Sequence, residues 1–379
     1  VTQPPKDGKA PLALIDNDVA IDSLDVSPMW NRIAIAGGTQ KGGDWKILNL
    51  RDGTCLVNGM NTEHRCWGAW AVSLSPDGRF MAVAGSRNLF FVVDANTGDL
   101  YWDLTQVAHL GVINNLYFTP DSRQLISVSN DMLIRVWDVK NRKAETVYWF
   151  SSINPVLNRW RDVRLKETGA RTQEVKGRYR TIARCAVSPD GKVLAVAGDL
   201  DGTVLFLELD TGKILKSLQT RLTVAWTPIF SEDGKWLVVG GTPKEGHCIE
   251  IWDLQKDIIL HCLGDKGVTA AHLALSPNKN TLISGGGGFR VWDVKTGKQR
   301  FSYFTKDDPR TPAIEIAPDA PPIKETRSAG VTFLPGGKTF LVAPSWLTRK
   351  TQIYFFDAET GQQVDFREAV KHLPKPAPK

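Results

Sequence analysis

Hydrophobic and polar positions along this chain follow a unit that recurs seven times. One copy, SPDGKVLAVAGDLDGTVLFLELDTG from Ser188 to Gly212, holds a turn, an apolar run, a second turn, another apolar run and a Thr-Gly pair. The first residue of the turn signature falls at seven places: Ser27, Ser75, Thr119, Ser188, Ser231, Ser276 and Leu334. Four of the six intervals between them measure 43 to 48 residues, and the other two measure 69 and 58.

Each unit predicts four β-strands. Pro-Asp-Gly and Thr-Gly supply tight turns, the β-branched runs between them predict strands, and an apolar stretch after Thr-Gly, such as KILKSL, predicts a fourth strand. A lone twisted sheet of this kind leaves both faces wet until neighbours cover them. The 69-residue interval exceeds the 43-residue one by only 26 residues, too few for another sheet. We therefore predict an all-β fold, a seven-bladed β-propeller of four-stranded antiparallel blades.

Three of the units carry a Trp-Asp pair at the same place in the repeat, and these pairs begin at Trp137, Trp252 and Trp292. With them, the sequence resembles the WD40-repeat family over about residues 11–361, and its plain repeats look like those of bacterial WD40 proteins. The resemblance implies a buried, hydrogen-bonded tetrad in the third unit, formed by His109, Ser127, Asp131 and Trp137. Most other units depart from the full tetrad pattern.

The repeat also sets the expected boundaries. We predict a propeller over residues 11–366, an extended tail at 1–10 and a second tail at 367–379. Two inserts, 151–180 and 305–328, occupy connections from an outer strand to the next inner strand, so both are expected on one face of the disc. The resemblance implies that Pro11–Ile15 supplies the outer strand of the last blade, and Gln362–Phe366 competes for that place.

The composition is that of a globular, soluble protein, and it narrows the function little further. Hydrophobic residues make up 42% and charged residues 23% of the chain, and no apolar run reaches the length of about 18 residues that a membrane helix requires. The net charge of +6 permits an acidic partner without requiring one. Because the chain starts at Val1 without a hydrophobic leader, it fits a cytoplasmic protein, an exported one after signal removal, or a segment of a longer one. The oligomeric state stays open.

The sequence predicts no catalytic, metal or cofactor site. None of the six histidines pairs with another histidine, a cysteine or a carboxylate at a recognised ligand spacing, and no G-x-S-x-G motif is present. The five cysteines form no C-x-x-C motif. Cys248 and Cys262 flank a hairpin in which residues whose numbers sum to about 510 face each other. A cross-strand disulfide is therefore feasible there, with two independent thiols as the alternative.

The insert 151–180 is the main candidate for partner binding because basic and aromatic side chains interleave in it. The candidate residues are Arg159, Trp160, Arg161, Arg164, Arg178, Tyr179 and Arg180. Arg and Trp are enriched at binding hot spots, so this insert suits docking of an acidic protein or an anionic lipid head group, whereas a nucleic acid is disfavoured without a nucleic-acid-binding fold. The alternative is a solvated loop. The proline-rich insert 305–328 predicts a rigid spacer or lid, with a recognition peptide as the alternative.

These observations favour a non-enzymatic scaffold or docking module that presents loops on one propeller face to a protein partner. One alternative is a sensor or docking domain of a larger exported or membrane-linked protein. Another is a ligand-binding protein or enzyme that uses the central channel. Acidic or histidine side chains converging on the channel axis would distinguish this last class, and the inner strands read as mainly apolar.

Overall fold

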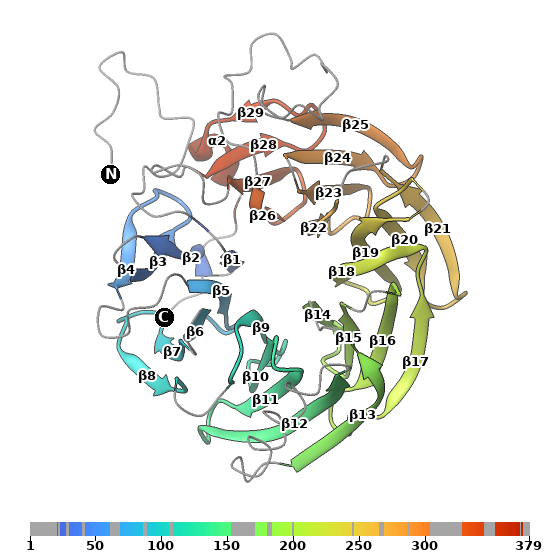
Figure 1. Cartoon of the computed structure of the whole chain (residues 1–379). Helices are drawn as coiled ribbons and strands as arrows, with labels where there is room; N and C mark the ends of the chain where they lie inside the picture. The colour runs from blue at the N-terminus through green and yellow to red at the C-terminus, as the bar shows by residue number, and fades with distance from the viewer. Residues whose placement is uncertain are drawn as a thin grey trace.

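The computed structural model shows seven β-sheets arranged in a ring, which confirms the predicted seven-bladed propeller (Figure 1). The sheets succeed one another around the ring in chain order, and the first strand of each lies nearest the centre (Figure 1). The structure describes residues 21, 23–27, 30–39, 42–60, 69–85, 89–105, 109–152, 171–179, 184–198, 201–244, 246–264, 269–286, 288–303, 328–344, 353–371 and 373.

The strands follow one another from the inner to the outer edge of each blade. Blades one to four contain β1 (Ser23–Ser27), β2 (Arg32–Thr39), β3 (Gly42–Asn49) and β4 (Cys55–Met60); β5 (Ala69–Leu74), β6 (Phe80–Gly85), β7 (Phe90–Asp94) and β8 (Leu100–Asp103); β9 (Ile113–Phe118), β10 (Gln124–Ser129), β11 (Leu133–Asp138), β12 (Lys143–Ser152) and β13 (Arg171–Tyr179); and β14 (Arg184–Val187), β15 (Val193–Ala197), β16 (Thr203–Glu208) and β17 (Ile214–Gln219). Blades five to seven contain β18 (Leu222–Phe230), β19 (Trp236–Pro243), β20 (Ile249–Asp253) and β21 (Ile258–Leu263); β22 (His272–Leu275), β23 (Thr281–Gly285), β24 (Phe289–Asp293) and β25 (Lys298–Tyr303); and β26 (Ser328–Phe333), β27 (Thr339–Pro344), β28 (Tyr354–Asp357) and β29 (Gln363–Val364).

Blade three departs from the predicted four strands. Its fifth strand, β13, lies on the outer edge and pairs in parallel with β12. Part of the insert predicted at 151–180 is therefore strand, and β12 itself extends to Ser152. The prediction missed β13 because an outermost strand is held by backbone hydrogen bonds to its neighbour and needs no apolar sequence.

The Ser-Pro-Asp-Gly turns fold because their side chains bond their own backbone. In blade two, Ser75 Oγ donates to Asp77 Oδ1 at 2.6 Å and accepts from the Phe80 N–H at 2.9 Å. Gly78 has a φ of 71°, a left-handed conformation that glycine adopts without strain. Blades four and five repeat the Ser and Asp contacts, so one turn chemistry connects the first two strands of several blades.

The hydrophobic core consists of seven clusters, and each lies between two neighbouring blades. Side chains that alternate along each second strand enter different clusters. In β2, Ile33 and Ile35 pack against blade seven, whereas Ala34 and Ala36 pack against blade two. These strands are apolar on both faces because a neighbouring blade covers each face, which explains why the sequence shows apolar runs there and no polar alternation.

The C-terminal segment joins the last blade to the first. β29 is the outer strand of blade seven, so the competing segment Gln362–Phe366 takes that place, and Pro11–Ile15 lies outside the described residues. A short turn returns the chain directly from β28, which requires little loop entropy. The helix α2 (Phe366–Val370) follows, with Asp365 as its N-cap.

Helix α2 and two buried side chains lie at or within the segment 367–379, which the sequence analysis expected to be a tail. Val370 and Leu373 are buried in the cluster between blades seven and one. Arg51 of blade one also donates from Nη2 to the Leu373 carbonyl at 3.2 Å. This segment therefore contributes to ring closure.

We predict that Leu373→Ala lowers the free energy of unfolding by about 2 kcal/mol, because it opens a cavity in the closing cluster. Leu100→Ala, in the outer strand β8, is the control because its side chain is 62% exposed, and it should change the stability by less than about 0.5 kcal/mol. Urea unfolding measures both. Equal stability of the two variants would contradict a closing role for Leu373.

Candidate functional site

The structure brings His109, Ser127, Asp131 and Trp137 together as one buried chain of hydrogen bonds. Trp137 Nε1 donates to Ser127 Oγ at 2.9 Å, and His109 Nε2 lies 2.8 Å from the same oxygen. His109 Nδ1 donates to Asp131 Oδ2 at 3.0 Å. Burial would raise the pKa of Asp131, but the influence of His109 and the hydrogen bonds from His109 and the Leu110 N–H outweigh it and leave the pKa below its ordinary value.

This arrangement contains the residue types of a hydrolytic triad, but its surroundings are structural. Ser127 is fully buried and His109 is 1% exposed, so no substrate carbonyl reaches the serine oxygen. That oxygen also accepts the indole N–H of Trp137. The tetrad instead ties the segment before β9 to β10 and β11 within blade three.

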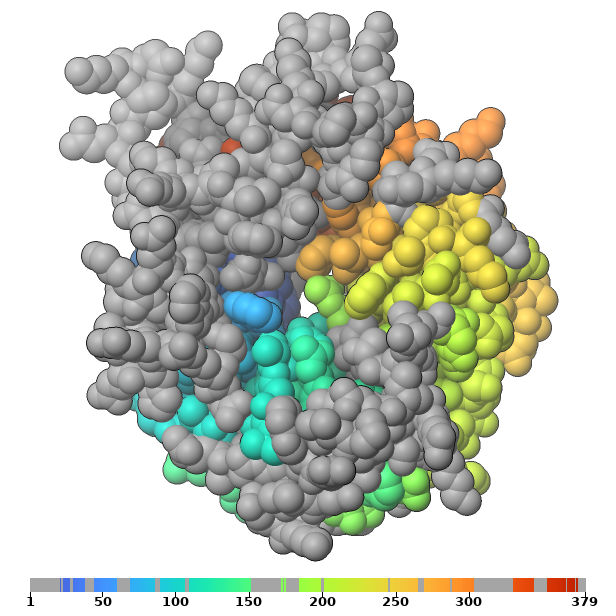
Figure 2. Space-filling view, viewed as in Figure 1, coloured from blue at the N-terminus to red at the C-terminus, as the bar shows by residue number. Residues whose placement is uncertain are grey.

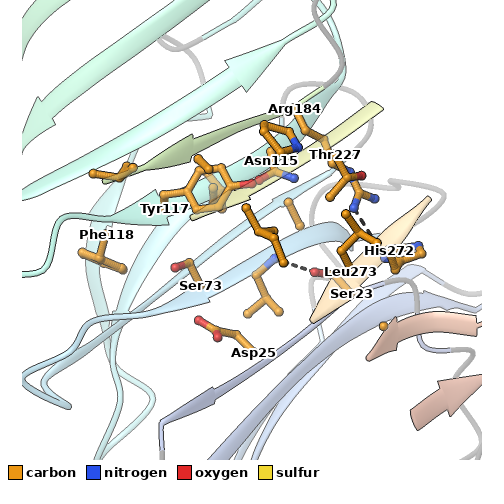
Figure 3. A pocket seen from close by; sticks show the side chains of 18 of the residues that line it. Ser23, Asp25, Ser73, Asn115, Tyr117, Phe118, Arg184, Thr227, His272 and Leu273 are labelled. Carbon is orange, nitrogen blue, oxygen red and sulfur yellow. Dashed lines mark hydrogen bonds between the residues drawn. The ribbon is translucent and has the colours of Figure 1, made fainter. Parts of the chain in front are cut away.

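A cavity of about 700 Å³ occupies the centre of the ring and is lined by all seven inner strands. Figure 2 shows one face of the molecule, with an opening at the centre between the inner-strand residues. Several polar side chains point into this cavity, including Asp25, Asn115, Tyr117, Arg184 and His272 (Figure 3). The inner strands are therefore less apolar toward the axis than the sequence analysis expected.

Arg184 and His272 lie next to each other in the channel. Arg184 of blade four reaches blade six, where its Nη1 donates to the Ala271 carbonyl at 3.1 Å and lies 3.4 Å from His272 Nδ1 (Figure 3). The pKa of His272 is lowered to about 3, chiefly by burial and then by the positive charge of Arg184. Burial also lowers the pKa of Arg184. At neutral pH, the channel therefore holds a charged guanidinium beside a neutral imidazole.

Asp25 contributes an acidic group to the same cavity. Its Oδ2 accepts from the Leu74 N–H and its Oδ1 from the Val26 N–H, each at 2.8 Å. Burial raises the pKa of this carboxyl above its ordinary value, and the two backbone hydrogen bonds oppose that rise. The carboxyl thereby links the inner strands of blades one and two.

A second feature of the inner strands is a β-bulge, five positions before the first residue of the turn signature. Among the residues that the structure describes, it occurs in four blades, at Trp70, Asn114, Trp226 and Ala329. Bulges redirect a side chain and are common next to functional sites. Here they leave Trp70 43% exposed and Trp226 37% exposed.

The two bulged tryptophans share one level of the ring. Six of the seven inner strands follow the outer strand of the preceding blade along the chain, and all seven sheets repeat the same antiparallel strand order, so equivalent positions lie near the same face. We call this the entry face. Trp70 lines the central cavity, and Trp226 directly precedes Thr227, which also lines it. Trp226 Nε1 donates to Thr242 Oγ1 at 2.8 Å, which orients its ring.

Blade five contains a cluster that the sequence analysis missed. Among the residues that the structure describes, His247, Glu250 and Cys262 place a nitrogen, an oxygen and a sulfur atom within 4.8 Å of one another. Glu250 is opposite Cys262 in the ladder between β20 and β21. The hairpin register was the signal that could have found this group.

The predicted register of this hairpin is wrong by two residues. Cys262 faces Glu250 and does not face Cys248, because a bulge lies between Ile251 and Trp252 and the turn is longer than assumed. Cys248 is buried and Cys262 is exposed, and both are thiols in the structure. The observed register therefore does not support a Cys248–Cys262 disulfide, which stays a prediction.

Most candidates in the basic insert lie outside the described residues, namely Arg159, Trp160, Arg161, Arg164 and Arg180. Arg178 and Tyr179 end strand β13, where their backbone pairs with Ser151 and Ser152. Their role in partner binding stays a prediction.

The ring of seven sheets and the buried tetrad define a WD40-type β-propeller. A family model described as "WD domain, G-beta repeat" matches residues 102–138. Apoptotic protease-activating factor 1 of Rattus norvegicus is 23% identical over 273 residues, which cover 65% of this chain and 21% of that protein. Serine-threonine kinase receptor-associated protein of Gallus gallus is 25% identical over 236 residues, covering 62% of this chain and 57% of that protein.

These matches make the chain similar to proteins of the WD40-repeat β-propeller family, and the ring of seven sheets agrees with that likeness. Members of this family generally act as scaffolds for protein interactions. The chain spans about a fifth of the rat relative and just over half of the chicken relative. Within the described residues, no helix combines the length and the apolar character needed to cross a bilayer.

We predict that His272 makes the fold sensitive to mild acid. Its pKa of about 3 lies below the ordinary value of 6.5. Below about pH 6.5, His272 therefore binds a proton in the unfolded chain but not in the folded chain, and the free energy of unfolding falls as the pH drops. Between about pH 7.5 and about pH 5.5, the wild type should lose about 1 kcal/mol more than His272→Gln does. Urea unfolding at both pH values measures this. Equal losses would contradict the assignment.

Proposed function

We propose that this chain is a non-enzymatic scaffold whose protein partner docks on the entry face, around the mouth of the central channel. The observation that supports it best is the pair of bulged tryptophans on two separate blades, Trp70 and Trp226, which remain exposed. Large aromatic side chains at the centre of an interface are frequent hot spots. A ring packed blade against blade presents them with little loss of conformational freedom on binding.

The chemistry of the described residues supports the non-enzymatic part of this proposal. The serine and histidine of the tetrad are buried and committed to hydrogen bonds with each other and with Asp131 and Trp137. Cys185 is also buried, and burial raises the pKa of its thiol, which keeps it protonated and weakly nucleophilic. The basic insert at 151–180 remains a proposed second contact, and an acidic partner remains a prediction.

The proposal predicts that Trp70→Ala combined with Trp226→Ala reduces capture of the native partner by about tenfold, because both aromatic anchors are lost. Tagged protein is incubated with lysate of its own cells, and captured proteins are quantified by mass spectrometry. The control combines Leu100→Ala with Ile258→Ala, which remove side chains that are 62% and 47% exposed on the outer strands of the same two blades. If the tryptophan variant captured the native partner as well as the control variant does, docking at the channel mouth would be refuted.

A second candidate function is binding of a small anionic ligand in the central channel. Arg184 and the neutral His272 support it, because they place a cation and polar groups inside a cavity of about 700 Å³. If this function is correct, native mass spectrometry of freshly purified wild-type protein detects a bound small molecule. The Arg184→Gln variant should carry no such molecule. A wild type with no added mass would count against it.

A further inference from the structure

Blade five replaces the hydrogen-bond pattern of the other Trp-Asp blades. In blades three and six, the tryptophan indole N–H donates to a serine of the second strand, at 2.9 Å in each. The equivalent residue of blade five is Val239, which offers no acceptor. Trp252 Nε1 instead donates to Glu250 Oε2 at 2.8 Å. In blade five, a carboxylate on the third strand therefore accepts the indole N–H, whereas blades three and six use a hydroxyl on the second strand.

Glu250 is fully buried and firmly held. Its Oε1 accepts from the Arg221 backbone N–H at 2.7 Å and lies 3.0 Å from His247 Nε2. Burying a carboxylate is costly unless hydrogen bonds or a positive charge compensate for the lost water. Backbone and indole N–H groups are neutral donors, so the site attracts a cation.

His247 and Cys262 extend this carboxylate into a set of three metal-binding donors. His247 is 8% exposed and lies three residues before Glu250, at the entry to β20. Cys262 is directly opposite Glu250 on β21 and is exposed to solvent. The three donor atoms lie within 4.8 Å of one another.

We propose that His247, Glu250 and Cys262 bind one Zn²⁺ ion, with water as a fourth ligand. Imidazole nitrogen, thiolate sulfur and carboxylate oxygen are the donors that zinc prefers, whereas magnesium and calcium prefer oxygen ligands. Zinc–ligand bonds of about 2.0 to 2.3 Å require donor atoms somewhat closer together than 4.8 Å. Rotation of the exposed Cys262 side chain supplies this closure.

The surroundings of Glu250 suit a metal ligand. The Arg221 N–H and the Trp252 indole orient its carboxylate from outside the donor set, as outer partners commonly do at zinc sites. Zinc takes the place of the hydrogen between His247 and Glu250, with the imidazole proton on Nδ1. Binding also releases the proton of the Cys262 thiol, so the affinity falls as pH is lowered.

The test uses the untagged full chain, freed of metal by a chelator. Zn²⁺ binding is titrated by calorimetry, and Co²⁺ serves as a spectroscopic probe because a cobalt–thiolate bond gives a charge-transfer absorption. We expect one equivalent of Zn²⁺ to bind and Cys262→Ser to weaken binding at least about tenfold and abolish that absorption. The matched control is Cys55→Ser, which alters another exposed cysteine and should leave both unchanged.

His247→Gln provides a second variant, and it should also weaken zinc binding while the Co²⁺–thiolate absorption shifts. Circular dichroism confirms that each variant is folded before titration. Absence of saturable zinc binding by the wild type, or equal affinity in Cys262→Ser, would overturn the proposal. Either result would leave the cluster as a hydrogen-bonded anchor for the connection between blades four and five.

Discussion

The structure depends on apolar contact between neighbouring blades. Each twisted sheet buries one face on the preceding blade and the other on the following blade, and each of the seven core clusters spans one such interface. An isolated blade would expose both faces to water. The ring must therefore close, and the cluster between blades seven and one, which includes Val370 and Leu373, joins its two ends.

Closure also explains how the molecule presents chemistry. Because the second strand of each blade is occupied by packing, variable side chains lie mainly at the inner-strand bulges, in the channel and farther out in the blades. Trp70 and Trp226 use the first of these places, and Arg184 and His272 use the second. Blade five shows a further variation. Val239 stands where blades three and six have a serine, and the Trp252 indole N–H donates to Glu250 instead.

The fold could be predicted from the sequence because the apolar runs that repeat along the chain are the strands that pack between neighbouring blades. The turn signature and the apolar runs follow from local chemistry that recurs in each unit, and the resemblance to WD40 repeats located the tetrad residues of blade three. The bulges at Trp70 and Trp226 were not foreseen, because a bulge breaks the alternation from which side-chain direction is inferred. The channel pair Arg184 and His272 was missed for a related reason, since two residues in different blades meet only when the ring is formed.

Register explains the remaining differences. A single bulge before Trp252 and a longer turn place Cys262 opposite Glu250 and not opposite Cys248. Cys262 thereby becomes part of a mixed donor cluster. Strand β13 carries no hydrophobic signal because it is added at an outer edge. Closure of the ring depends on α2, a short helix whose buried face is defined only by the blades on either side.

The central claim is that a preformed ring binds a protein at its entry face. Hydrogen–deuterium exchange of the protein, alone and bound to a captured partner, tests it most directly. The account predicts added protection in Ala69–Leu74 and Leu222–Phe230, with unchanged exchange in second strands such as Phe80–Gly85. Protection confined to the outer strands, or a change spread across all the blades, would contradict it.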